Sequence, residues 1–327
     1  MAAQPRKRIF VTQRLTDNTQ KRLESLTQYD VDQWETGPLS HEELLKCVKG
    51  VHGIFCLSSN EINKEVMEAA GDSLKVISTM SVGHNHIDLV EAKKRGIVVG
   101  YTPDVLTDAV ADLAMALVLM VSRRLVEAVE TAKTGGWITM QPNFLLGHQL
   151  TGKTAGIIGL GRIGEGLATR LRAFGVKKIL YNGRRPKPDV ALRAHANYVD
   201  LDVLLRESDV VALCCSLNDS TFHLFDYSAF RQMKPSAIIV NVARGEVIKQ
   251  EDLVAALSNG IIAGAGLDVV TPEPLPVDHP LYKFKNCIVL PHIASATVET
   301  RDAMGNLAID HVVAGIEGQP LQYALDI

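Results

Sequence analysis

TAGIIGLGRIGEGLATRLRAF, residues 154–174, joins an apolar run to a glycine-rich turn and then to a helical pattern. Gly159, Gly161 and Gly164 give this turn the spacing G-x-G-x-x-G, where the predicted strand meets the predicted helix. The first glycine permits a tight turn, the second lets the backbone approach a pyrophosphate, and the third allows close packing of helix on sheet. Free N–H groups at the start of the helix favour phosphate oxygens. The stretch therefore predicts a dinucleotide-binding unit.

Short apolar runs rich in β-branched residues recur on both sides of this turn, with helical-looking segments between most of them. The predicted strands are 8–12, 51–57, 74–80, 96–101, 154–160, 178–180, 209–215, 237–243, 263–270 and 287–292. Runs without strict two-residue alternation are typical of strands covered on both faces, and helical connections are typical of parallel sheets. The pattern predicts an α/β protein with helices on each side of a parallel sheet. Longer helices are predicted over 105–131 and 297–315.

The composition is that of an ordinary globular protein. A chain of 327 residues is long for one core and comfortable for two domains. The hydrophobic content of 46% and charged content of 22% are unremarkable, and the net charge of -3 argues against nucleic acid or an anionic membrane as partner. The longest apolar run, 113–121, is about half of what a bilayer-spanning helix needs. The five cysteines lack paired metal spacing, which favours reduced thiols and a cytoplasmic location.

The segment after the second strand of the dinucleotide unit departs from the usual pattern. A carboxylate normally stands there to bind a ribose hydroxyl. This chain has Arg184 and Arg185 instead, with Lys187 close behind. Guanidinium groups form forked, charge-assisted hydrogen bonds with phosphate oxygens, so we expect NADP(H), with NADPH preferred over NADH. The competing interpretation is that both arginines are solvated loop charges.

Polar side chains stand at or near the ends of several predicted strands. Ser216 and Arg244 directly follow their strands, Asp268 lies within 263–270 with Glu273 shortly after it, and His292 ends 287–292. Ligands of open α/β sheets lie beyond the carboxyl ends of the strands, so these side chains are expected around a nicotinamide. Arg244 suits a two-pronged pair with the carboxylate of a 2-oxo acid. His292 suits proton donation to the carbonyl oxygen, and Glu273, if it touches the imidazole, would favour the imidazolium. Taken singly, each is equally compatible with an ordinary polar loop.

Together these residues resemble the D-2-hydroxyacid dehydrogenases over essentially the whole chain. The segments that carry the resemblance are VISTMSVGHNHIDL, GYTPDVLTDAVADLAM, GIIGLGRIG, VNVARGEVI, AGLDVVTPEPLP and LPHIASAT. STMSVGHNH, YTPDVLTD and NGRRP are most similar to the glyoxylate/hydroxypyruvate reductases within that family. The resemblance implies two Rossmann-like domains. A coenzyme domain with a doubly wound parallel sheet, 103–297, would be inserted into a flavodoxin-like substrate domain, 1–102 with 298–327. It also implies a homodimer.

The resemblance further implies the residue roles. His292 would be the acid–base residue, Glu273 its partner and Arg244 the carboxylate anchor. The other implied substrate contacts are Val82, Gly83, Asp268 and Ser295. The implied cofactor contacts are Gly159, Gly161, Arg162, Ile163, Gly164, Arg184, Arg185, Pro186, Lys187, Ser216, Val242 and Asp268. The expected activity is the NADPH-preferring reduction of glyoxylate to glycolate and of hydroxypyruvate to D-glycerate.

Two alternatives remain open. One is a D-2-hydroxyacid dehydrogenase acting on 3-phosphoglycerate or a longer 2-oxo acid, although a phosphate would want more basic residues than His84 and His86 near the carboxylate loop. These two histidines stand without other ligands nearby in sequence, so no metal site is expected. The other alternative is a nucleotide-sensing binding protein similar to the corepressors of the C-terminal-binding type. The lack of a long disordered tail or a basic patch favours the enzyme.

Overall fold

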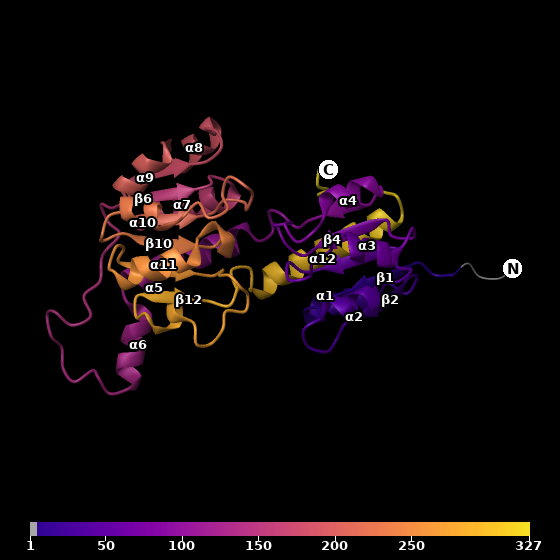
Figure 1. Cartoon of the computed structure of the whole chain (residues 1–327), viewed down its shortest axis with the longest axis horizontal. Coiled ribbons are helices and arrows are strands. Elements are labelled where there is room, and N and C mark those ends of the chain that lie inside the picture. Colours follow the sequence, from indigo (N-terminus) through magenta and orange to yellow (C-terminus); the bar gives the residue numbers. More distant parts are fainter. Residues whose placement is uncertain (1–4) are drawn as a thin grey trace. The chain divides into compact units, whose positions relative to one another are not determined.

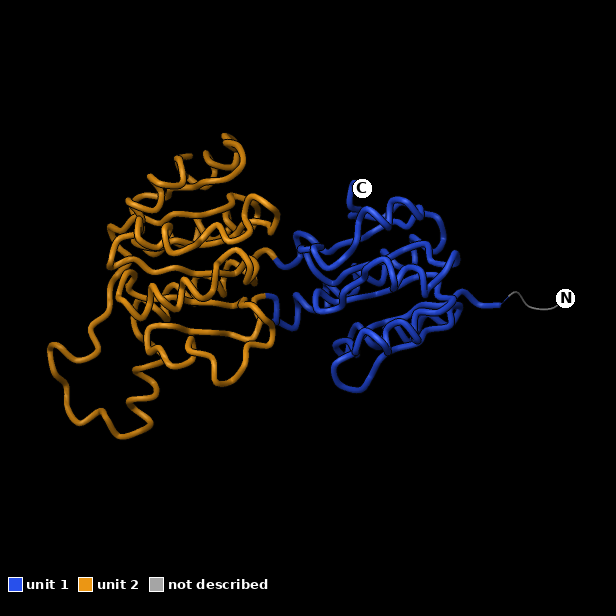
Figure 2. The backbone as a smooth tube through the Cα atoms, in the orientation of Figure 1, with its two compact units in different colours: residues 1–106, 295–327 blue, residues 107–294 orange. Residues whose placement is uncertain are grey.

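The computed structural model describes residues 5–327, which form two compact units. One unit contains the described residues through Leu106 together with Ser295–Ile327, and the other contains Thr107–Ala294 (Figure 2). Each unit has a parallel β-sheet of its own. The first unit is therefore assembled from two separate stretches of the chain, with the second unit inserted between them.

The boundaries of these units differ slightly from those expected from the sequence. Residues 103–106 and 295–297 group with the first unit, whereas the sequence prediction assigned them to the second. The Tyr323 hydroxyl donates a hydrogen bond of 2.9 Å to Asp104 Oδ2, which ties residue 104 to the C-terminal segment of the first unit.

The first unit is built on a five-stranded parallel sheet in the order β2-β1-β3-β4-β5. Its strands are β1 (Arg8–Val11), β2 (Asp30–Gln33), β3 (Gly53–Cys56), β4 (Val76–Thr79) and β5 (Val98–Gly100). Its helices are α1 (Asp17–Glu24), α2 (His41–Cys47), α3 (Lys64–Ala70), α4 (Leu89–Lys94) and α12 (Val298–Ile316). Helix α12 packs on β3 and β4. The strand order is the flavodoxin-like one that the resemblance implies.

The second unit is built on a seven-stranded parallel sheet in the order β12-β11-β10-β9-β6-β7-β8 (Figure 1). Its strands are β6 (Thr154–Ile158), β7 (Lys178–Asn182), β8 (Ala196–Tyr198), β9 (Val210–Leu213), β10 (Ile238–Asn241), β11 (Gly264–Leu267) and β12 (Cys287–Val289). Its α-helices are α5 (Thr107–Ser122), α6 (Leu125–Lys133), α7 (Arg162–Ala173), α8 (Pro188–Ala194), α9 (Leu201–Glu207), α10 (Tyr227–Gln232) and α11 (Gln250–Ser258). Two short 3₁₀ helices are η1 (Gly245–Val247) and η2 (Pro280–Lys283). The order reverses between β6 and β9, which confirms the predicted doubly wound sheet.

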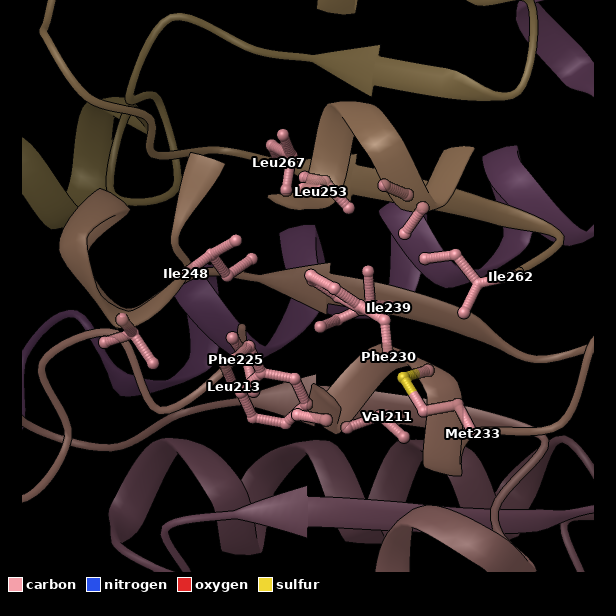
Figure 3. Packing of buried hydrophobic residues seen from close by; sticks show 14 of the residues in the cluster. Val211, Leu213, Phe225, Phe230, Met233, Ile239, Ile248, Leu253, Ile262 and Leu267 are labelled. Atoms are coloured by element: carbon pink, nitrogen blue, oxygen red, sulfur yellow. The ribbon is translucent and has the colours of Figure 1, made fainter. Parts of the chain in front are cut away.

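Apolar helix faces cover this second sheet. Helices α9, α10 and α11 pack on one face through a cluster of buried side chains, and Phe225, Phe230 and Ile239 point into it (Figure 3). Helices α5 and α7 pack against each other and on the strands β10, β11 and β6. Full burial of such a side chain contributes about 1.5–3 kcal/mol relative to exposure, so this cluster fixes the strand ends that carry the polar residues.

The prediction of a single long helix over 105–131 is wrong. The structure has two helices, α5 and α6, separated at Arg123 and Arg124. Arg124 has a left-handed backbone with φ of 54° and ψ of 39°, which interrupts the helical hydrogen bonding. Helix α5 is buried along one side, whereas α6 has no buried residue, so the chain leaves the core at this break.

The strands β2 and β8 were not predicted. Both lie at an edge of their sheet, where a strand needs little apolar surface. Strand β2 has the sequence DVDQ, whose single apolar residue gives no strand pattern.

Within residues 5–327, no helix combines the length and apolarity needed to cross a membrane.

Candidate active site

The glycine turn lies at the reversal point of the second sheet, between the end of β6 and the start of α7. Gly159 has φ of 92°, and a Cβ placed there would lie 2.7 Å from the Cα of Cys215. A Cβ at Gly164 would clash with the carbonyl oxygen of Gly159. By contrast, nothing lies within 4 Å of a Cβ built at Gly161. The first and third glycines thus serve the turn and the packing, while open space surrounds the position of the second.

A cavity of about 500 Å³ opens beside this turn, within the usual size range for small-molecule sites. Expected cofactor residues that line it are Gly159, Gly161, Arg184, Arg185, Lys187 and Ser216. Arg162, Ile163, Gly164, Pro186 and Val242 are not among its lining residues. The cavity is therefore bounded by the segments that follow β6, β7 and β9, at the carboxyl edge of the sheet.

Sequence reasoning missed part of this lining. Asn218, Ser220 and Thr221 also bound the cavity, in the loop after Ser216. The Thr221 hydroxyl donates to the Ser216 carbonyl oxygen at 2.8 Å and accepts from the Asn218 N–H at 2.8 Å, which shapes the loop. The signal in the sequence was the polar run SLNDST directly after an apolar strand.

The two arginines after β7 are exposed at the cavity. Within residues 5–327, neither Arg184 nor Arg185 makes a hydrogen bond or an ion pair. The Lys187 ammonium donates to the Leu160 carbonyl oxygen at 3.1 Å, inside the glycine turn. An ammonium has three donors, so this bond leaves Lys187 able to face an anion as well. Positive charge without a counter-charge thus lies on one side of the cavity.

Glu273 and His292 are in direct contact. Their Oε2 and Nδ1 atoms lie 2.7 Å apart, and Glu273 Oε1 accepts a hydrogen bond of 3.1 Å from the N–H of Val270. Burial alone would raise the pKa of Glu273, but the hydrogen bond and charge of His292, the Val270 N–H and Arg244 outweigh it and hold this pKa below its usual value. Because Nδ1 is engaged, Nε2 is the imidazole nitrogen that remains for a substrate.

Arg244 is half-buried at the end of β10. Its Nη1 donates to the Ala243 carbonyl oxygen at 2.8 Å. Burial lowers the pKa of Arg244 while the negative charges of Glu273 and Glu246 act in the opposite direction, and an arginine keeps its proton in any protein. Asn241, a residue that sequence reasoning missed, is fully buried and donates to the Arg244 carbonyl oxygen at 2.9 Å. The turn that presents the guanidinium is therefore held from within the strand.

Asp268 has a positioning role that the sequence did not indicate. It is 1% exposed, and its two carboxylate oxygens accept from the N–H groups of Ile293 at 2.8 Å and Ala294 at 2.9 Å. Its carbonyl oxygen accepts from the His292 N–H at 3.0 Å. Burial raises the pKa of Asp268, against the lowering effect of those backbone bonds and of His292. His292 has a left-handed backbone with φ of 54°, and Asp268 holds the chain in that conformation.

The remaining expected substrate residues, Val82, Gly83 and Ser295, belong to the first unit. The Ser81 hydroxyl donates to the Gly83 carbonyl oxygen at 2.6 Å, and Thr79 Oγ1 lies 2.8 Å from Ser81 Oγ and 2.9 Å from His86 Nε2. His86 thus takes part in shaping this loop. Over residues 5–327, no group of three histidine, cysteine or carboxylate side chains is arranged to bind a metal.

A family model and individual relatives of this chain indicate the same protein family. Residues 115–294 match the family model described as D-isomer specific 2-hydroxyacid dehydrogenase, NAD binding domain. A human glyoxylate reductase/hydroxypyruvate reductase is 47% identical over 321 residues, which cover 98% of each chain. A glyoxylate reductase from Thermofilum pendens is 44% identical and covers 96% of this chain and 93% of its own.

Two solved structures extend the likeness to the fold. The TT0316 protein from Thermus thermophilus has a TM-score of 0.91 and 41% identity, and the match covers 97% of this chain and 99% of that one. An NADPH-dependent glyoxylate/hydroxypyruvate reductase from Sinorhizobium meliloti, in complex with NADP and malonate, has a TM-score of 0.86 and 32% identity. That match covers 98% of this chain and 97% of the other.

Proposed function

Because the chain belongs to the D-isomer specific 2-hydroxyacid dehydrogenases, we propose that it reduces glyoxylate to glycolate and hydroxypyruvate to D-glycerate, with NADPH preferred over NADH. The observation that carries this proposal is the contact of 2.7 Å between Glu273 and His292, at the same sheet edge as Arg244. A paired imidazole and a half-buried guanidinium are the two protein groups that reduction of a 2-oxo acid needs. The name of the human relative supports the choice of substrates.

Each residue has one task in this reaction. Arg244 would hold the substrate carboxylate in a two-pronged ion pair and so orient the carbonyl group. Bound NADPH would supply the hydride. His292 would deliver a proton from Nε2 to the carbonyl oxygen as negative charge develops there. Glu273 would stabilise the imidazolium before that transfer and keep Nε2 directed at the substrate.

The family assignment extends the proposal to further contacts. Val82, Gly83 and Ser295 would bind substrate, and Asp268 would act near the nicotinamide end mainly by fixing the backbone after His292. Gly161 and the start of α7, with Arg162, Ile163 and Gly164, would bind the pyrophosphate. Pro186, Ser216 and Val242 would complete the cofactor contacts.

The proposed NADPH preference depends on Arg184 and Arg185. Both are exposed at the cavity without a partner in residues 5–327, and no carboxylate takes the position that would bind an unsubstituted ribose. A 2′-phosphate offers the oxygens that guanidinium groups pair with. The NADPH-dependent relative from Sinorhizobium meliloti supports this proposal, and NADH is the proposed weaker cofactor.

We also propose a cytoplasmic homodimer. The segment after α6 exposes five large apolar side chains: Trp137 at 70%, Ile138 at 90%, Met140 at 83%, Phe144 at 37% and Leu146 at 64%. Exposed apolar side chains gathered in one segment suit an interaction site, and a second copy of the chain is the partner that fits the family.

The proposal is tested by steady-state kinetics on the purified protein. Glyoxylate and hydroxypyruvate should be reduced, with a higher kcat/KM for NADPH than for NADH. Faster turnover of 3-phosphoglycerate or of a longer 2-oxo acid would instead assign a different member of the same family. Nucleotide binding without turnover of any 2-oxo acid would assign a nucleotide-sensing binding protein.

A further inference from the structure

Two tyrosine hydroxyls anchor the loop that carries Arg184 and Arg185, one at each end. The Tyr198 hydroxyl donates to the Gly183 carbonyl oxygen at 3.1 Å, before the arginines. The Tyr181 hydroxyl accepts from the Lys187 N–H at 2.9 Å, after them. The backbone of the loop is therefore held on both sides of the two guanidinium-bearing residues.

The two tyrosines also hold each other. Tyr181 in β7 and Tyr198 in β8 are direct partners in the parallel register. Their rings meet edge to face, with centroids 5.3 Å apart and planes at 70°. Such aromatic pairs contribute more than their buried area alone. The edge strand β8 thus supplies one half of a rigid pair that fixes the loop.

A further bond links the same loop to the glycine turn. The Lys187 ammonium donates to the Leu160 carbonyl oxygen at 3.1 Å, between Gly159 and Gly161. The loop beside the proposed 2′-phosphate is therefore tied to the turn beside the proposed pyrophosphate. The guanidinium groups of Arg184 and Arg185 are left exposed and unpaired among residues 5–327, so the backbone is ordered while the charges stay available.

We propose that Tyr181 and Tyr198 are positioning residues for cofactor selection. They hold the loop 183–187 in place before the cofactor binds, so Arg184 and Arg185 can meet the 2′-phosphate of NADP(H) without the loop having to become ordered. This inference rests on the proposed NADPH preference. Binding to a mobile loop costs the entropy of ordering it, and a loop that is already held avoids that cost. The hydroxyls therefore favour a ligand with a 2′-phosphate and are indifferent to one without it.

Phenylalanine substitutions isolate the hydroxyls. Tyr181 is 2% exposed, and Tyr181→Phe keeps its buried ring while removing the acceptor for Lys187. Tyr198→Phe removes the donor to Gly183, and Tyr198 does not line the cavity, so its effect cannot come from direct ligand contact. Tyr282→Phe is the matched control, because the Tyr282 hydroxyl makes no hydrogen bond within residues 5–327.

The experiment measures binding of adenosine 2′,5′-bisphosphate and of 5′-AMP by calorimetry, and KM for NADPH and NADH with glyoxylate. Each tyrosine variant should weaken binding of the bisphosphate and raise the NADPH KM by about three- to tenfold, the value of one lost hydrogen bond. In both tyrosine variants, the binding of 5′-AMP and the KM for NADH should stay at wild-type values. In the control Tyr282→Phe, the binding of both nucleotides and the KM values for NADPH and NADH should all stay at wild-type values. Unchanged 5′-AMP binding also reports a folded site.

A double-mutant cycle separates positioning from general structural support. In a chain that already has Arg184→Ala and Arg185→Ala, the tyrosine substitutions should have no further effect on the bisphosphate, because they act through the arginines. Equal weakening for both ligands, or an undiminished effect in the arginine-free background, overturns the inference. If the wild type itself does not prefer NADPH, the proposed preference fails and the inference with it. If the wild type does prefer NADPH and the variants keep that preference, only the inference fails.

Discussion

Glu273 Oε2 lies 2.7 Å from His292 Nδ1, although Glu273 belongs to the loop after β11 and His292 to the segment after β12. The pairing of β11 with β12 brings the two segments together. Asp268, also after β11, binds the backbone that follows His292. The Glu273 carboxylate thus contacts the imidazole of His292 directly, whereas Asp268 fixes the backbone at His292 and at the two residues that follow it.

The lowered pKa of Glu273 predicts a specific pH dependence of stability. A carboxylate whose folded-state pKa is lower than its unfolded-state value stabilises the fold above the unfolded value, and this contribution is lost as pH falls through the folded value. We therefore expect the thermal midpoint of the wild type to fall more steeply below about pH 4 than that of Glu273→Gln. Glu130→Gln, which changes a carboxylate without a partner in residues 5–327, should retain the wild-type slope. Identical slopes for all three proteins would contradict the assigned effect of the His292 contact.

Replacing both arginines after β7 should change the cofactor preference. Charge-assisted hydrogen bonds contribute about 1.5–3 kcal/mol, so Arg184→Ala with Arg185→Ala should raise the NADPH KM by about 10- to 100-fold. The NADH KM should change little, because NADH has no 2′-phosphate. Arg231→Ala on α10 is the control, since it removes an arginine outside the cavity lining. Equal changes for both cofactors would show that the two arginines are only solvated loop charges.

Removal of the imidazole should affect turnover more than binding. His292→Ala should lower kcat by about 10²–10⁴-fold, the usual contribution of a positioned acid or base. The KM for NADPH should change far less, because the proposed nucleotide contacts are elsewhere. His41→Ala, which removes a histidine paired with Glu65 in the first unit, should leave kcat unchanged. Near-normal turnover in His292→Ala would exclude this residue from the mechanism.

Alanine substitutions at two glycines of the turn should have different effects, one on stability and the other on cofactor binding. In Gly164→Ala the new Cβ meets the Gly159 carbonyl oxygen, and overpacking of this kind typically costs about 1–3 kcal/mol, so the thermal midpoint should fall. In Gly161→Ala the Cβ enters open space, so the midpoint should stay near the wild-type value while NADPH binding weakens. Normal cofactor affinity in Gly161→Ala would indicate that no pyrophosphate approaches this glycine.

Charges placed in the exposed apolar segment should disrupt the proposed dimer. Ile138→Asp with Met140→Asp should convert a dimer to a monomer in sedimentation equilibrium, because two carboxylates would have to be desolvated in the interface. Val277→Asp, at a position that is 94% exposed in a different loop, should remain dimeric. A wild-type chain that sediments as a monomer would contradict the proposed homodimer.

Much of the fold could be predicted from the sequence because its signals are local. The β-branched runs predicted the strands from β1 to β12 except β2 and β8, which are two of the four edge strands. A strand at an edge needs little apolar surface, so its sequence can lack the apolar run. The spacing of Gly159, Gly161 and Gly164 predicted the turn between β6 and α7. The break between α5 and α6 was missed, because the left-handed backbone of Arg124 leaves no mark in an otherwise helical pattern.

The amino-acid sequence by itself determined the α/β class, the family and the set of polar residues at the strand ends, because periodicity and motif spacing are properties of neighbouring residues. Only the tertiary structure decided which of those residues meet. The contact of Glu273 with His292, the backbone bonds of Asp268 and the pairing of Tyr181 with Tyr198 each depend on strand order and register. These are set when distant segments pack around one core, and no local pattern along the chain contains them.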